Sequence, residues 1–214
     1  MKTRDRIIHS ATELFNDQGE RNITTNHIAA HLGISPGNLY YHFRNKEDII
    51  HSIFDQYARH LSESFTPARS DEIKLENLMG YLDAIFYLMW QFRFFYANLP
   101  DILSRDEPLQ QKYLKAQEQL RAAVVALLRS LREGGIINVS DEDLPDLGQT
   151  IKMVVTCWIP FQIAQAPNTR ITKPLLYQGV LRVLFLLRPY VQPQVADQIC
   201  QLEQHYRQLA QPAG

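Results

Sequence analysis

Residues 24–43, "TTNHIAAHLGISPGNLYYHF", contain two short helical segments joined by a tight turn. Ser35 is a good N-cap for the second segment, and Pro36 suits its first position. Gly33 allows the left-handed backbone that a sharp turn needs. Ala29, four residues earlier, is small enough for the second helix to cross closely over the first. This spacing predicts a helix-turn-helix.

The second segment divides its side chains between a core and a surface. Leu39 and Phe43 lie four residues apart and share one helix face, which can hold the helix against its domain. In a helix-turn-helix the second helix enters the DNA major groove, and its N-terminal residues reach base edges. We therefore expect Asn38 and Tyr40 to contact bases, whereas the following two residues are better placed for phosphates.

The local charge supports this interpretation, although the formal net charge of the chain is −1. Residues 21–46 contain no acid and carry three Arg or Lys residues and three histidines, as a phosphate-binding surface requires. Backbone N–H groups at the start of the first segment also favour a phosphate. The expected DNA contacts are Thr24, Thr25, Ser35, Pro36, Gly37, Asn38, Tyr40, Tyr41, His42 and Lys46. The alternative is a helical hairpin with polar faces in solvent.

The rest of the chain also has helical periodicity, which predicts an all-α fold. Hydrophobic residues make up 45% of the 214 and charged residues 21%, as is ordinary for a globular protein with its own core. The expected helices are 4–18, 24–33, 35–43, 46–65, 71–98, 107–132, 146–164, 175–188 and 193–209. Lys2, Arg4 and Arg6 form a basic N-terminal arm. "TPARSD" (66–71) breaks the pattern, and "PDILSRDEP" (100–108) interrupts it again.

Several functional classes lack their sequence signals. No apolar run approaches the roughly 18 residues of a membrane span, and the N-terminus does not read as a secretory signal. Cys157 and Cys200 are far apart in sequence, which is typical of free thiols in a reducing cytoplasm. There is no Gly-rich phosphate loop, nucleophile elbow or metal-spaced His/Cys set. We expect a cytoplasmic protein with no membrane segment, metal, cofactor or catalytic residues.

At its first 50 or so residues the sequence resembles the tetracycline-repressor (TetR) family of bacterial transcription regulators. The family pattern is present as Phe15, Gly19, Thr24, Ile28-Ala29, Gly33-Ile34-Ser35, Gly37-Asn38-Leu39-Tyr40-Tyr41-His42-Phe43 and Lys46. No element of this pattern is missing, and the pattern is highly specific. The remainder matches only in length and helical character.

The resemblance implies a homodimer that binds a double-stranded DNA operator and releases it when a small ligand moves a linker helix. It implies an N-terminal three-helix helix-turn-helix domain at 1–46, a linker helix at 47–65, and an effector-binding and dimerisation domain at 66–214. Repression is the commoner mode in the family. A DNA-binding regulator without a small effector, controlled by a protein partner or by its own level, remains the alternative.

By the same analogy, the dimer interface is expected on the helices at 146–164 and 175–188. The second helix offers an apolar face, and Gly179 permits close approach of another helix. The residues of that face are Leu176, Val180, Val183, Leu184 and Leu187. The alternative is that this face covers the core of its own chain.

Large aromatic and amphipathic side chains after residue 80 could line an effector pocket, because such pockets are mostly apolar with a few polar groups. The candidates are Trp90, Phe94, Tyr113, Gln117, Trp158 and Gln162. Acids are sparse among them, which favours a neutral or anionic apolar or amphipathic effector over a multivalent cation. Pro160 either kinks the helix around it and opens a cavity, or the helix ends at Ile159.

Overall fold

The computed structural model describes residues 2–66, 75–166 and 169–212, and it confirms the all-α fold. Its ten α-helices, in the part of the chain described, are α1 (Thr3–Gln18), α2 (Thr25–Leu32), α3 (Pro36–His42), α4 (Lys46–Ser64), α5 (Leu75–Gln91), α6 (Arg93–Ser104), α7 (Glu107–Glu133), α8 (Leu144–Gln165), α9 (Lys173–Leu187) and α10 (Ala196–Leu209). A short 3₁₀ turn, η1 (Glu20–Asn22), joins α1 to α2. The one β-type pairing among these residues is an isolated bridge between Ile137 and Val191.

The helix-turn-helix forms as its local signals predict. Ser35 accepts a hydrogen bond from the backbone N–H of Asn38 at 3.2 Å and so caps α3. Gly33 closes α2 with φ +67°, the left-handed conformation that the turn requires. Leu39 and Phe43 are buried and join the stripe of α1 in one core. The side chains of this small domain therefore fix where α3 presents its other faces.

Two residues of the basic N-terminal arm, Arg4 and Arg6, lie in α1, which begins at Thr3, one residue before the expected start. Arg4 therefore lies in the helix, with its guanidinium 5.0 Å from the centre of the Phe43 ring. The same group donates a 2.8 Å hydrogen bond to the hydroxyl of Ser52 in α4. Arg4 thus links α1 to Phe43, at the end of α3, and to Ser52 of α4.

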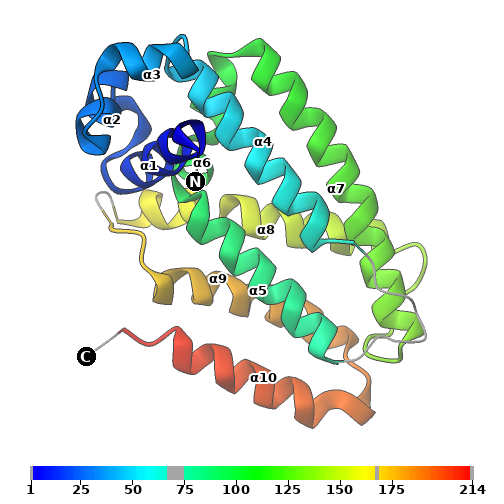
Figure 1. Cartoon of the computed structure of the whole chain (residues 1–214). Coiled ribbons are helices and arrows are strands. Elements are labelled where there is room, and N and C mark those ends of the chain that lie inside the picture. The colour runs from blue at the N-terminus through cyan, green and yellow to red at the C-terminus, as the bar shows by residue number, and fades with distance from the viewer. Residues whose placement is uncertain (1, 67–74, 167–168, 213–214) are drawn as a thin grey trace.

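The helices are arranged in two connected parts (Figure 1). α1–α3 gather around the beginning of α4, and α4 then runs alongside α5 and α7. α8 packs on α7 and α9, while α9 packs between α5 and α10. α4 therefore belongs to both parts: its first residues close the helix-turn-helix core and its last residues line the interior of the larger part.

The expectation of a single helix at 71–98 is wrong, because two helices, α5 and α6, occupy the described part of this range. Its expected start lies outside the described residues, and the described portion breaks at Phe92, whose φ/ψ of −118°/32° is not helical. Asn16 of α1 stabilises the break, because its amide donates to the carbonyl of Gln91 at 2.9 Å and accepts from the N–H of Phe94 at 3.0 Å. α6 then runs to Ser104, but it is kinked at Asn98, the expected helix end, where a φ/ψ of −127°/18° is not helical. The chain is helical again through Pro100, so only Arg105 and Asp106 of the expected interruption lie outside a helix.

The other element boundaries follow the sequence closely. α7 begins after Asp106, whose carboxylate accepts from the N–H of Leu109 at 2.9 Å. α8 passes through Pro160 and ends at Gln165, so the expectation that it could end at Ile159 is wrong. The boundary expected at 66–71 falls, beyond Thr66, outside the described residues.

Candidate DNA-binding surface and ligand cavity

α3 presents its polar and aromatic residues outward. Tyr40 and Tyr41 are 49% and 85% exposed, which is unusual for aromatic side chains of this size. His42 is partly buried, with its ring 5.1 Å from that of Tyr41 in an edge-on arrangement. The other expected contacts at the start of α3 are also exposed: Ser35, Pro36, Gly37 and Asn38.

Two of the expected DNA contacts at the start of α2 already have partners within the protein. The hydroxyl of Thr24 accepts from the backbone N–H of His27 at 3.3 Å, as an N-cap does. The hydroxyl of Thr25 lies 3.0 Å from that of Tyr40, and this hydrogen bond joins the first turn of α2 to the recognition helix. The Tyr40 ring is thereby held in one orientation on the exposed surface.

Lys46 is placed differently from a free phosphate ligand. Its ammonium lies 2.7 Å from the carboxylate of Glu20 and donates to the Glu20 carbonyl at 3.1 Å. Arg105, which follows α6, pairs with the other Glu20 oxygen at 2.9 Å. The phosphate contact of Lys46 stays a prediction.

Three further contacts join the DNA-binding end to α6. Arg93 donates to the carboxylate of Asp17 at 2.6 Å, and Arg21 pairs with Asp101. The hydrogen bond from Arg21 lowers the pKa of Asp101. The ring of Phe94 packs 5.3 Å from that of Phe15 in α1. α1 and η1 are therefore fastened to α6 by ion pairs around an apolar contact.

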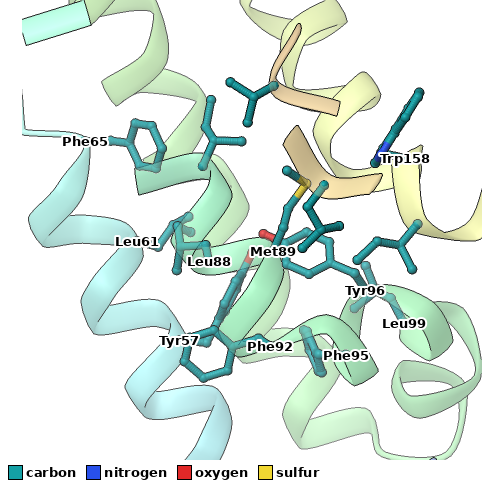
Figure 2. Packing of buried hydrophobic residues seen from close by; sticks show 14 of the residues in the cluster. Tyr57, Leu61, Phe65, Leu88, Met89, Phe92, Phe95, Tyr96, Leu99 and Trp158 are labelled. Atoms are coloured by element: carbon teal, nitrogen blue, oxygen red, sulfur yellow. The ribbon is translucent and has the colours of Figure 1, made fainter. Parts of the chain in front are cut away.

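A cavity of about 50 Å³ lies among α4, α5, α7 and α8. Its lining residues are Tyr57, Leu61, Phe65, Ile85, Leu88, Tyr96, Gln117, Leu120, Val124, Ile151, Lys152, Val155 and Thr156. Figure 2 shows Tyr57, Leu61 and Phe65 projecting from α4 towards Leu88 and Met89 of α5. The walls are mainly apolar, so polar groups that reach this space stand out.

The polar groups that line the cavity come from α4, α6, α7 and α8. Burial raises the pKa of Tyr57, and side-chain hydrogen bonds from Tyr96 and Gln117 partly offset that rise. The amide oxygen Oε1 of Gln117 is buried without a hydrogen-bond partner. A buried acceptor left unsatisfied costs about 1–3 kcal/mol, so this position favours a bound molecule or water that can donate to it.

The six residues expected to line one pocket are not brought together. Gln117 lines the cavity, whereas Trp158 and Gln162 line a separate open groove on α8 and α9. Phe94 packs against α1, and the ring of Tyr113 lies among Phe54 and Phe95. Trp90 lies 4.2 Å beneath the guanidinium of Arg93 and so serves the contact with Asp17.

Of the described residues that line the cavity, the sequence interpretation identified only Gln117 and missed the others, including those on α4. Tyr57 and Leu61 belong to its inward-facing stripe and have the same spacing as ordinary core positions. Their periodicity indicates burial but does not distinguish a packed core from the wall of a cavity. Only the relative placement of α7 and α8 shows the difference.

The apolar face of α9 that was expected to form the dimer interface is intramolecular core. Leu176, Val180, Val183, Leu184 and Leu187 are all buried within the single chain. Gly179 likewise serves the chain itself, because a Cβ there would lie 2.7 Å from the Trp158 ring of α8. The Trp158 indole N–H donates to the carbonyl of Leu175 at 2.8 Å and locks the two helices together.

A different apolar surface is exposed on the same two helices. Met153, Phe161 and Phe185 are 56%, 52% and 58% exposed, respectively. They line the open groove of about 600 Å³ together with Trp158, Gln162 and Arg182. Exposed apolar side chains that cluster in this way mark an interaction surface.

A helix-turn-helix with an exposed recognition helix, carried on a larger helical part with an internal cavity, defines a DNA-binding regulator. Residues 7–53 match the model described as bacterial regulatory proteins, tetR family, and residues 56–199 match that of a bacterial transcriptional repressor, TetR. The chain belongs to the TetR family of DNA-binding transcriptional regulators.

Among solved structures, a TetR-family transcriptional regulator from Marinobacter aquaeolei VT8 is 41% identical, with a TM-score of 0.86 over 97% of this chain and 100% of that one. The HTH-type regulator SrpR of Pseudomonas putida is 33% identical over 85 residues, which are 39% of this chain and 40% of the relative. The uncharacterized HTH-type regulator TtgW, also of Pseudomonas putida, is 33% identical over 85 residues, or 39% of this chain and 63% of the relative. These two matches span less than two thirds of the relatives' lengths.

The described residues also bear on membrane insertion and metal binding. No helix among them is long and apolar enough to cross a membrane. Within residues 2–66, 75–166 and 169–212, no three His, Cys, Asp or Glu side chains come together as a candidate metal site.

Proposed function

We propose that this protein is a repressor that binds a palindromic operator as a homodimer and releases it when a small, mostly apolar effector enters the cavity. The observation that supports this proposal is the position of α4. It begins at Lys46, four residues after α3 ends at His42, and it contributes Tyr57 and Leu61 to the cavity wall, with Phe65 directly after its last residue. One helix therefore connects the effector site with the recognition helix.

The small size of the cavity explains how effector binding would change operator binding. Sites for drug-sized ligands measure about 300–1,000 Å³, whereas this cavity measures about 50 Å³. A drug-sized effector is larger than this cavity, so its binding must move the cavity walls apart. It binds more tightly to a state in which α4 has shifted, and so it shifts the population towards that state.

Contacts at the other end of the molecule turn a shift of α4 into a change of the recognition helix. Glu20 is paired both with Lys46 of α4 and with Arg105 after α6. His51 of α4 lies 2.7 Å from the carboxylate of Asp106, which caps α7. α4 cannot move relative to α6 and α7 without straining or breaking these contacts.

The exposed apolar surface of α8 and α9 is the proposed homodimer interface. An interface of twofold symmetry uses the same patch on both subunits, and the apolar side chains of this groove suit such a contact. Two recognition helices would then face successive major grooves of the operator. We retain the division into residues 1–46, 47–65 and 66–214, and the ten proposed DNA contacts, as parts of this proposal.

Selection from a random duplex library at physiological salt, followed by effector screening on the selected site, tests the proposal. A palindromic consensus with half-sites about one DNA turn apart, or a multiple of this spacing, is the expected result. Compounds that release the protein from that site would establish effector control. Operator binding that no compound of any chemical class reverses would favour the alternative, a regulator controlled by a protein partner or by its own level.

A further inference from the structure

The α8 wall of the cavity carries two hydrogen-bond donors that have no partner among the described residues. Lys152 and Thr156 both line the cavity and lie one helical turn apart, so they share a face of α8. In the part of the chain that the structure describes, no carboxylate pairs with the Lys152 ammonium, and no hydrogen bond uses the Thr156 hydroxyl. The two donors point to a ligand group with two acceptor oxygens.

The α8 wall of the cavity carries a positive charge, that of Lys152. Among the described residues, no Asp or Glu belongs to the cavity lining. Burial lowers the pKa of Lys152, and the nearby positive charge of Arg121 lowers it further. Arg121 is itself without an acidic partner among the described residues. A partly buried cation without a partner is costly, and an anion that enters the cavity would remove that cost.

We infer that the effector is an apolar molecule with a carboxylate, and that Lys152 and Thr156 bind the carboxylate while α4, α5 and α7 enclose the apolar body. This inference rests on the proposed function, because it specifies the class of molecule that acts at the same cavity. The apolar body would contact Leu61, Leu88 and Leu120. The amide oxygen of Gln117, which has no hydrogen-bond partner, supplies a further polar contact for a ligand that carries a hydrogen-bond donor.

Calorimetric titration of the full chain with three matched probes tests the charge preference. Octanoate, 1-octanol and octylammonium share one apolar body and differ only in the head group. Octanoate should bind about tenfold more tightly than 1-octanol, as expected for a charge-assisted contact, and octylammonium more weakly than either. Equal affinities for octanoate and 1-octanol, or no binding of octanoate, would overturn the carboxylate assignment.

Variants of the cavity wall test which side chains bind the carboxylate. Lys152→Met keeps the length of the side chain and should lower octanoate affinity about tenfold while leaving 1-octanol affinity unchanged. Thr156→Val should produce a smaller loss, and Lys152→Arg should retain most of the affinity. Lys115→Met, which removes an exposed lysine of α7 outside the cavity lining, is the matched control. Octanoate affinity that is unchanged in Lys152→Met would overturn the assignment.

The two proposals fail in different ways. Release of the operator by neutral apolar compounds, with no response to octanoate, would leave effector control standing and reject the carboxylate. Tight, Lys152-dependent octanoate binding without operator release would support the site and reject its coupling to DNA.

Discussion

The ammonium of Lys46, at the first position of α4, lies 2.7 Å from the carboxylate of Glu20, a side chain with an exposed fraction of 1%. A buried carboxylate depends on its partners, because water cannot replace them. Here one partner comes from the DNA-binding end and the other, Arg105, from the larger part.

Lys46→Met should therefore lower the free energy of unfolding by about 2 kcal/mol or more, because Glu20 keeps only Arg105 as a partner. The urea unfolding midpoint measures this loss. Lys112→Met is the control, since its pair with Asp55 lies on the surface and should contribute less than about 1 kcal/mol. Equal effects of the two variants would contradict a structural role for the Glu20 pair.

Asn16→Ala should weaken the junction between α5 and α6. The variant removes both hydrogen bonds at the helix break and leaves the Gln91 carbonyl and the Phe94 N–H without that partner. We expect a loss of about 1–2 kcal/mol in thermal or urea unfolding. Gln201→Ala, on an exposed position of α10, should have almost no effect. A loss no larger than that of Gln201→Ala would show that the break does not depend on Asn16.

Tyr40→Ala should reduce specific operator affinity by about 10- to 100-fold, within the range of a direct base contact, without unfolding the protein. Fluorescence anisotropy with operator and scrambled duplexes separates the specific loss from the general one. Tyr87→Ala removes another half-exposed tyrosine, on α5, and should leave operator affinity unchanged. Unchanged operator affinity in the Tyr40 variant would remove this residue from the DNA surface.

Phe185→Glu should shift the protein from dimer to monomer, because it places a charge on the wall of the exposed apolar groove. Sedimentation velocity over a range of concentrations measures the shift. Leu114→Glu introduces the same charge on an exposed position of α7 and should preserve the dimer. A Phe185→Glu protein that remains dimeric would place the interface elsewhere.

Val155→Phe should make the protein less responsive to effectors while it still binds its operator. The larger ring occupies part of the small cavity and leaves less space for a ligand that moves α4. Operator release as a function of effector concentration measures this change. A wild-type release curve in a well-folded Val155→Phe protein would mean that the effector acts at another place.

The sequence predicts the helix-turn-helix well because its signals are local. The caps at Thr24 and Ser35, the left-handed Gly33 and the spacing of Leu39 and Phe43 all act within a few residues, and the structure confirms each. The ends of α7 and α9 follow the expected limits for the same reason.

The break between α5 and α6 was not predictable in this way, because Asn16, which stabilises it, lies about 75 residues earlier in the chain. That the six pocket candidates do not line one cavity was not predictable for a related reason. Phe94 and Tyr113 have the periodicity of any buried aromatic, and only the positions of α1 and α4 determine what they contact. The apolar stripe of α9 could cover either its own core or a partner, since both uses require the same side chains.

The contacts from α1 and η1 to α6 also have a practical consequence for building chimeric regulators. A DNA-binding unit cut out at residue 46 or 65 would leave behind the partners of Asn16, Asp17 and Glu20. In the chimera, the transplanted DNA-binding unit would pack against the α6 of another protein, which lacks the matching hydrogen-bonding and charged groups. The unit that can be exchanged between relatives is therefore the DNA-binding unit together with residues 91–105. Chimeras that include residues 91–105 should retain the response to effector better than chimeras that omit them.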